Sequence, residues 1–115
     1  MNCDGSMVKN IKYSHEFLHE FKRLKKKYRS LEKDFGRLLL SLVDNPLQGT
    51  ALALQMRKIR LGITSKRKGT RGGARVIIRY KIENGELRFL YIYDKSEMEN
   101  VSADFLKNIL LETDS

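Results

Sequence analysis

Basic side chains that could bind phosphate crowd into one short stretch of the sequence, residues 57–81. They are Arg57, Lys58, Arg60, Lys66, Arg67, Lys68, Arg71, Arg75, Arg79 and Lys81. No acidic residue lies between Asp44 and Glu83, although the chain is rich in charge. Such a surface repels itself, so it is expected to face a polyanion.

Two interpretations of these cations are open. In the first, mutual repulsion lowers the pKa of one lysine toward neutrality, and that lysine acts as a general base on an RNA 2′-hydroxyl. Neighbouring arginines would then stabilise the charge that builds on the phosphate. In the second, the same residues only hold phosphates, and each contact adds salt-dependent affinity. Taken alone, the residues favour plain binding.

Other catalytic sets are missing from the sequence. The Lys-Gly-Thr at positions 68–70 lacks the glycine spacing of a phosphate-binding P-loop. There is no GxSxG motif, no Cys–His pair and no zinc-ligand spacing, and the basic stretch holds no carboxylates for a metal-dependent nuclease. We therefore predict a site that uses no metal and no cofactor.

Length and composition bound the remaining possibilities. Residues 1–115 are expected to form a single domain, with residues 1–6 interpreted as an added leader or a disordered segment. The net charge of +9 points to nucleic acid, an anionic membrane or an acidic protein as the partner. Because the single Cys3 cannot form an internal disulfide, a reducing cytoplasm is the expected location. The longest apolar run, residues 38–43, is far shorter than the roughly 20 residues that span a bilayer.

Periodic apolar residues predict the elements that must position the cations. A short strand is expected over residues 8–13, followed by a helix over residues 14–28 that Ser14 caps. A second helix, capped by Ser30, is expected over residues 31–43 and ends at an Asp-Asn-Pro sequence. The turn between the helices is so short that they should form an antiparallel hairpin.

Two features of the first helix could be functional. The side opposite its apolar stripe carries a run of basic residues, which we interpret as a solvated face in preference to a nucleic-acid contact. His15 and His19 lie one turn apart, a spacing that would suit a metal or a catalytic pair. No Cys or carboxylate motif supports them, so both histidines are predicted to be exposed to solvent.

The second half of the chain alternates between apolar and polar residues. This pattern predicts strands over residues 56–63, 74–82 and 86–93. The Asn-Gly dipeptide at 84–85 predicts a hairpin between the last two strands. Ser102 is expected to cap a final helix. The strand over residues 86–93 has apolar residues on both sides, so its orientation cannot be assigned from parity.

Together these elements predict an α+β fold. An N-terminal antiparallel helical hairpin should pack on a small, mostly antiparallel, twisted sheet of three or four strands, with a short C-terminal helix. The helices should cover the sheet face that bears Ile59, Leu61 and Ile63. Basic residues of the other parity should then converge on an open face; they are Lys58, Arg60, Arg75 and Arg79.

Three sequence runs resemble one known family. RKIRLGI, KRKGTRGGARVIIRY and LYIYDKSEMENVS are similar to the RelE/ParE superfamily, the toxins of type II toxin–antitoxin modules, and most of all to its RelE-like and HigB-like branch. The resemblance covers about residues 8–111. It implies a sheet backed by two N-terminal helices, and a ribosome-dependent endoribonuclease that cleaves mRNA without a metal. Attack by the 2′-hydroxyl would give a 2′,3′-cyclic phosphate.

The resemblance also implies roles for particular residues. Lys58 and Arg60 match the basic pair on the family's second strand, and Arg75 matches the arginine that would stabilise the transition state. Lys95 matches a catalytic lysine, and Tyr93 would stack on a base or orient the phosphate. The residues expected to bind RNA are Lys66, Arg67, Lys68, Arg71 and Arg79.

The family pattern is not complete, and it leaves alternatives. Met98 stands where many RelE-like toxins have an arginine, and Ser102 stands where they have a tyrosine. The ParE branch, which inhibits DNA gyrase, shares the fold without a nuclease site. A non-catalytic RNA-binding module is the third alternative. The expected partners are the ribosome, mRNA and an acidic antitoxin that covers the basic face or displaces the C-terminal helix, in an oligomeric complex without a membrane.

Overall fold

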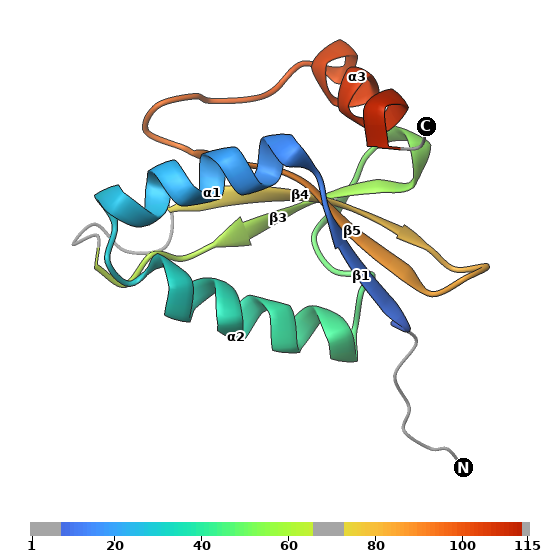
Figure 1. The fold of residues 1–115 in the computed structure, drawn as a ribbon, viewed down its shortest axis with the longest axis horizontal. Coiled ribbons are helices and arrows are strands. Elements are labelled where there is room, and N and C mark those ends of the chain that lie inside the picture. The colour runs from blue at the N-terminus through green and yellow to red at the C-terminus, as the bar shows by residue number, and fades with distance from the viewer. Residues whose placement is uncertain (1–7, 66–72, 114–115) are drawn as a thin grey trace.

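The computed structural model describes residues 8–65 and 73–113 of the chain. In chain order its elements are β1 (Asn10–Tyr13), α1 (His15–Lys27), α2 (Leu31–Asp44), β2 (Thr50–Ala51), a 3-10 turn η1 (Ala53–Gln55), β3 (Met56–Leu61), β4 (Ala74–Lys81), β5 (Glu86–Asp94) and α3 (Ala103–Thr113). The strands form one sheet in the order β1-β5-β4-β3-β2 (Figure 1). Strand β1 is parallel to β5, and the other pairings are antiparallel. The predicted α+β fold is confirmed.

The prediction of three or four strands is wrong, because the sheet has five. The additional strand is β2, whose two residues pair with Lys58 and Arg57 of β3. Gly49 directly precedes β2 and has φ +81°, and a Cβ at that position would clash with the Lys58 carbonyl. A strand of two residues has no alternation that a sequence pattern could reveal.

Helices α1 and α2 cover one face of the sheet through an aromatic cluster. Phe17 of α1, Phe35 of α2 and Phe89 of β5 have ring centroids 5.1–5.5 Å apart. Fully burying a side chain of this size stabilises a fold by about 1.5–3 kcal/mol. Replacing Phe17, which is 1% exposed, with alanine would remove that burial and leave a cavity, at a cost of about 3–5 kcal/mol.

A serine precedes each of the first two helices, but only Ser14 caps its helix as predicted. Ser14 caps α1 as expected: its Oγ accepts a hydrogen bond from Phe17 N (2.9 Å) and donates one to Leu90 O (2.6 Å). Ser30 does not cap α2 through its side chain. Its hydroxyl instead donates to Asp34 Oδ2 at 2.8 Å, because that carboxylate lies one turn further along the helix.

Strand β5 contains one extra residue, Leu90. Ile77 of β4 pairs with Tyr91, whereas the next residue, Ile78, pairs with Phe89, so no residue of β4 pairs with Leu90. Such a β-bulge shifts the alternation of side chains along the strand. Before Leu90 the odd-numbered residues of β5 face α1 and α2, and after Leu90 the even-numbered residues do. A sequence pattern that assumes regular alternation therefore could not orient this strand.

Helix α3 covers the middle of the other sheet face. Its Leu106, Ile109 and Leu110 belong to a second core with Ile77 and Tyr91. The predicted open face is therefore wrong in its central part. Two central strands present apolar side chains to that side, and burial of those side chains requires a cover.

Two predicted local signals are confirmed. Gly85 has φ +68° and donates its N–H to Lys81 O at 2.9 Å, which closes the β4–β5 hairpin. The Oγ of Ser102 accepts a hydrogen bond from Phe105 N at 3.1 Å and caps α3. No helix in the described parts of the chain is long and apolar enough to cross a lipid bilayer.

Candidate active site

Two arginines and a tyrosine from three adjacent strands lie in one cross-strand row. The register pairs Arg60 of β3 with Arg75 of β4, and Arg75 with Tyr93 of β5. Directly paired residues in antiparallel strands share a face and lie about 4.5–5.5 Å apart. The row, here called the arginine–tyrosine row, thus brings together three of the five residues predicted to be catalytic.

Burial increases along this row from the outer strand to the inner one. Arg60 is exposed, Arg75 is 9% exposed and Tyr93 is 3% exposed. Burial raises the pKa of Tyr93, and the positive charge of Arg75 opposes that effect, so the phenol is protonated at neutral pH. The Tyr93 hydroxyl has no hydrogen-bond partner within residues 8–65 and 73–113. A buried hydroxyl without a partner is uncommon in folded proteins and can mark a functional group.

The two predicted catalytic lysines lie on either side of the row along the strands. Lys58 is two residues before Arg60 on β3, and its Nζ lies 3.4 Å from Asn100 Oδ1. Lys95 directly follows β5, and its backbone N–H donates to Gly73 O at 3.1 Å. All five predicted catalytic residues therefore belong to one end of the sheet.

A network of ionic hydrogen bonds fixes the turn that carries Lys95. Asp94 is fully buried and accepts hydrogen bonds from Tyr28 Oη (2.5 Å) and Lys27 Nζ (3.2 Å) of the α1 end. Glu97 accepts from Arg23 Nη2 at 2.6 Å and from Lys27 at 3.0 Å, and these hydrogen bonds lower the pKa of Glu97. The turn after β5 is therefore held to α1 on the far side of the sheet.

The same network adds to the interpretation of α1. The run of basic residues is exposed to solvent, as predicted, and two of its members, Arg23 and Lys27, also pair with carboxylates of the β5 turn. Both side chains keep 43–47% exposure, so each pair contributes less than a buried one would. The predicted exposure of His15 and His19 is confirmed.

Four of the five residues predicted to bind RNA lie outside the described residues. They are Lys66, Arg67, Lys68 and Arg71, in the segment 66–72. The segment starts after Thr64 and Ser65, whose position is fixed by α2. Thr64 donates its N–H (2.9 Å) and its hydroxyl (2.5 Å) to the buried carboxylate of Asp34. The chain thus leaves β3 at the end of the sheet that holds the arginine–tyrosine row.

Arg79 does not join that row, contrary to the predicted convergence. It pairs with Met56 on one side and with Arg88 on the other, four residues further along β4 than Arg75. Ile77 and the α3 core lie between the two arginines. The single face predicted from parity is therefore divided into two basic ends by the second hydrophobic core.

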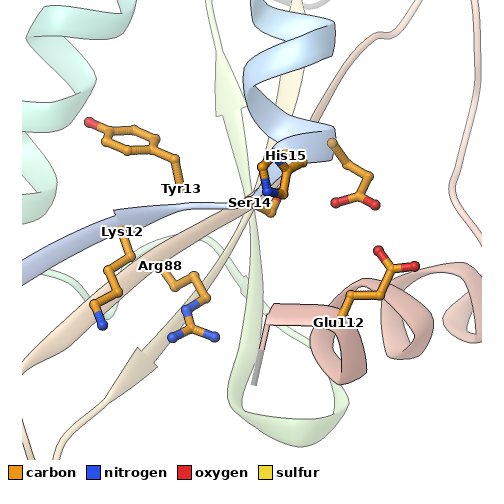
Figure 2. A pocket seen from close by; sticks show the side chains of 7 residues that line it. Lys12, Tyr13, Ser14, His15, Arg88 and Glu112 are labelled. Atoms are coloured by element: carbon orange, nitrogen blue, oxygen red, sulfur yellow. The ribbon is translucent and has the colours of Figure 1, made fainter. Parts of the chain in front are cut away.

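The second basic end contains a carboxylate of its own. Arg88 Nη2 lies 2.7 Å from Glu86 Oε2, and both side chains are less than 10% exposed. Lys12 of β1 approaches the same carboxylate at 3.8 Å. Lys12, Arg88 and Glu112 of α3 line a cavity of about 270 Å³. Figure 2 shows how these three side chains lie around it.

Sequence reasoning missed some members of both ends. The Glu86–Arg88 pair had a detectable signal, because residues two apart on a strand share a face. Asn100 beside Lys58 had none, since its contact spans 42 residues and depends on the path of the loop before α3. Within the described residues, no group of three or more His, Cys, Asp or Glu side chains could hold a metal ion.

Comparison with known proteins bears on the fold. No protein-family model matches this sequence. A mutant of the Escherichia coli toxin RelE in the free state is similar to this structure with a TM-score of 0.57 at 13% sequence identity, covering 92% of this chain and 97% of that one. The isolated Escherichia coli RelE toxin is similar with a TM-score of 0.59 at 11% identity, covering 90% and 97%. The predicted resemblance is thus confirmed at the level of architecture: this chain has the fold of the RelE toxins.

Proposed function

We propose that this protein is the toxin of a type II toxin–antitoxin module and a metal-free endoribonuclease that cleaves mRNA on the ribosome. The observation that carries the proposal is the arginine–tyrosine row with Lys58 and Lys95 on either side, in a chain with the RelE fold. Fold alone does not define an activity, so the proposal depends on these side chains.

The row supplies what a phosphoryl transfer without a metal requires. The scissile phosphate would lie over Arg75 and Tyr93, where the guanidinium and the phenol donate hydrogen bonds to its non-bridging oxygens. A guanidinium suits this role because it stays charged and presents several donors in one plane. Arg60, exposed at the outer end of the row, would bind the neighbouring phosphate.

The reaction follows from this placement. The 2′-hydroxyl gives its proton to a general base, for which Lys58 and Lys95 are the candidates, and its oxygen attacks the adjacent phosphorus. The bond from phosphorus to the 5′-oxygen breaks, and that oxygen takes up a proton. The products are a 2′,3′-cyclic phosphate and a 5′-hydroxyl end. Arg75 stabilises the additional negative charge that the phosphate carries between these two states.

The partners follow from charge. The chain carries +9, and its acid-free run includes most of the proposed site, so RNA and the ribosome would be attracted over long range. An acidic antitoxin would compete for the same cations and so restrain the toxin. We propose the cytoplasm as the location, since mRNA under translation is found there.

The proposal is tested by mapping RNA 5′ ends by primer extension after brief expression in growing bacteria. We compare the wild-type protein, Arg75→Ala and the matched control Lys33→Ala, whose side chain is exposed on α2. New 5′ ends within translated mRNA are expected for the wild type and for Lys33→Ala, and not for Arg75→Ala.

The opposite results have defined meanings. Absence of new 5′ ends while the cells arrest would reject the endoribonuclease. A DNA-damage response with intact mRNA would replace it with the gyrase inhibitor. Strongly salt-dependent RNA binding without growth arrest would leave the non-catalytic RNA-binding module.

A further inference from the structure

Three acidic side chains of this basic protein line the space between α1 and α3. They are Glu16 and Glu20 of α1 and Glu112 of α3, here called the acidic strip. The strip follows two cavities, of about 310 Å³ and 270 Å³, which adjoin because His15 and Glu16 line both of them. In a chain with a net charge of +9, such a local excess of negative charge attracts a cation.

Two members of the acidic strip lie close enough to share a hydrogen bond. Glu16 lies in the first turn of α1 and Glu112 in the last turn of α3, and the hydrogen bond between their carboxyl groups raises the pKa of Glu112. Such a bond needs a proton, because ionised carboxylates have only acceptors. A positively charged donor between the two groups would take the place of that proton and remove their repulsion.

The acidic strip has a regular spacing. Glu16 and Glu20 are both half-buried and lie four residues apart on α1, so they share one side of the helix with Cβ atoms about 5–6 Å apart. Glu20 also lies 3.0 Å from Arg23 Nη2, so its charge is partly engaged. On α3, Phe105 and Glu112 are seven residues apart and therefore share one face of that helix. A ligand that follows the strip would thus run between facing sides of α1 and α3.

The wall of the larger cavity that faces α1 is aromatic. Strand β1 pairs with β5 only as far as Phe89, so at Tyr91 the edge of β5 lies next to the first turns of α1. Tyr91 meets Phe105 edge to face, with ring centroids 4.9 Å apart, and Phe105 keeps 37% exposure. Aromatic rings attract cations over their faces, and methylene groups pack on the same apolar surface.

The phenol of Tyr91 is a buried polar group at this wall. Tyr91 is only 8% exposed, and it lines the larger cavity together with Glu20. Burial, and then the charge of Glu20, raise the pKa of Tyr91, so the phenol is protonated at neutral pH. In the part of the chain that the structure describes, its hydroxyl makes no hydrogen bond. The phenol oxygen is therefore placed to accept a hydrogen bond from a ligand beside Glu20.

Two observations narrow the class of the cation. Since no group of three or more His, Cys, Asp or Glu side chains among the described residues could hold a metal ion, the strip suits an organic cation. Lys12 and Arg88 also line the smaller cavity, and Figure 2 shows them together on the side away from Glu112. They would repel a ligand that extended past Glu112. The strip therefore matches one positive charge for each of its carboxylates and opposes a further one.

We propose that the acidic strip binds an aliphatic polyamine with three ammonium groups, one beside each carboxylate. Spacers of about three to four methylene groups hold neighbouring ammonium groups at nearly the separation of Glu16 and Glu20. The spacers pack on Phe105, and the Tyr91 phenol oxygen accepts a hydrogen bond from the ammonium group beside Glu20. The binding site uses none of the residues of the proposed endoribonuclease, so it goes beyond the proposed function and does not depend on it.

The test is isothermal titration calorimetry of the full chain at fixed, low ionic strength and without RNA. The ligands are the diamine putrescine, the triamine spermidine, the tetraamine spermine, Mg²⁺ and a tetralysine peptide. We compare the wild type with Glu16→Gln, Phe105→Ala and the matched control Glu32→Gln, which removes the same charge from an exposed position on α2. Circular dichroism verifies that each variant is folded.

Spermidine should bind at one site per chain and about tenfold more tightly than putrescine, because it makes one more charged hydrogen bond. Spermine should gain less than about twofold over spermidine, since its fourth ammonium group would meet Lys12 and Arg88. Glu16→Gln should weaken spermidine binding about tenfold, and Phe105→Ala about threefold through the loss of the ring. Glu32→Gln should match the wild type.

Other outcomes overturn the proposal. Affinity that rises steadily with ligand charge up to spermine, or equal effects of Glu16→Gln and Glu32→Gln, would mean that the surface only collects counterions. Absence of spermidine binding, or Mg²⁺ binding as tight as that of spermidine, would also reject the site. Tighter binding of tetralysine than of spermidine would assign the strip to a basic segment of a partner protein instead. Because the titration contains no RNA, its result is independent of the 5′-end mapping.

Discussion

The two basic ends of the sheet face opposite α1 and α2 have similar charge and different construction. The arginine–tyrosine row combines Arg60, Arg75 and Tyr93 and contains no acidic residue. At the other end, Arg88 and Lys12 surround the buried carboxylate of Glu86. The second end therefore contains an anion among its own residues, whereas the arginine–tyrosine row itself contains only cations and a phenol. We accordingly expect a phosphate to bind at the first end, and the ion pair at the second end to be structural.

Two acidic residues lie near the arginine–tyrosine row, but their carboxylates accept hydrogen bonds on the other side of the sheet, which the helices cover. Asp94 accepts hydrogen bonds from Tyr28 and Lys27 of α1, and Asp34 of α2 accepts them from Thr64. These carboxylates stabilise the turns on both sides of the row. Their negative charge is already engaged by donors on the helix-covered side.

The largest expected difference between the two ends is catalytic. Arg75→Ala should lower the rate of mRNA cleavage by about 10²–10³-fold, the usual effect of removing one donor to a developing anion. Arg79→Ala, on the same strand and the same face, should change the rate by less than about threefold once the folded fraction is measured. A single-turnover cleavage assay on a programmed ribosome provides both numbers.

The control for this comparison is Arg75→Lys, which keeps a cation in place of the buried guanidinium. It should stay folded by circular dichroism and lose most of the activity, because an ammonium cannot donate in the same planar geometry. Equal losses for Arg75→Ala and Arg79→Ala would mean that the two ends do not differ in function.

The next effect concerns stability and belongs to the second end. Glu86→Gln removes the negative charge that lies 2.7 Å from the buried guanidinium of Arg88, so the free energy of unfolding should fall by about 3–5 kcal/mol. Urea denaturation followed by circular dichroism measures this loss. The double variant Glu86→Leu with Arg88→Met should recover most of the stability, since apolar residues often replace a buried ion pair without loss. A stable Glu86→Gln protein would show that the pair is not structural.

The pH dependence of stability should reveal the acid that supports the first end. Burial opposes ionisation of Asp34, but hydrogen bonds from Thr64 and Ser30 and the charge of Arg37 outweigh it and lower the pKa of Asp34. The carboxylate therefore stabilises the fold fully above the unfolded-state pKa of about 3.9, and this contribution is lost as the pH falls through the folded-state value.

Asp34→Asn should accordingly lower the free energy of unfolding by about 2 kcal/mol at neutral pH. The difference from the wild type should shrink as the pH falls below about 4. Denaturation curves recorded across this pH range test it, and a difference that stays constant with pH would contradict the assignment to an ionised carboxylate.

The smallest effect is on binding. Arg60→Gln removes one exposed cation that we propose contacts phosphate, so the slope of log affinity against log salt for single-stranded RNA should decrease by about 0.7. Lys12→Gln, at the second end, should leave the slope unchanged, because that lysine lies beside Glu86. Equal changes in both variants would indicate that RNA contacts the whole face.

The main elements could be predicted because each has a strong local signal. The apolar stripe of α1, the cap at Ser14 and the Asn-Gly turn each depend on residues close together in sequence. The arginine–tyrosine row was predictable in part, because parity placed Arg60 and Arg75 on one face. Tyr93 was assigned to the site only through the resemblance to a toxin family.

The division of the basic face could not be predicted, because it depends on two non-local facts. The bulge at Leu90 exists only in the pairing between β4 and β5, and no residue type marks it. The position of α3 over Ile77 depends on the loop before it, which has no periodic pattern. Parity therefore placed Arg79 beside Arg75, whereas the folded chain inserts a hydrophobic core between them.

The extra residue at Leu90 also bears on how the gene could vary. Deleting its codon would restore regular alternation and leave every later residue of β5 on its present face, because Phe89 and Tyr91 already face opposite sides of the sheet. Tyr93 would stay opposite Arg75, and Asp94 would stay on the side of α1. A single in-frame deletion here would thus preserve the geometry of the proposed site and remove only the apolar side chain that Leu90 adds to the core beneath α3.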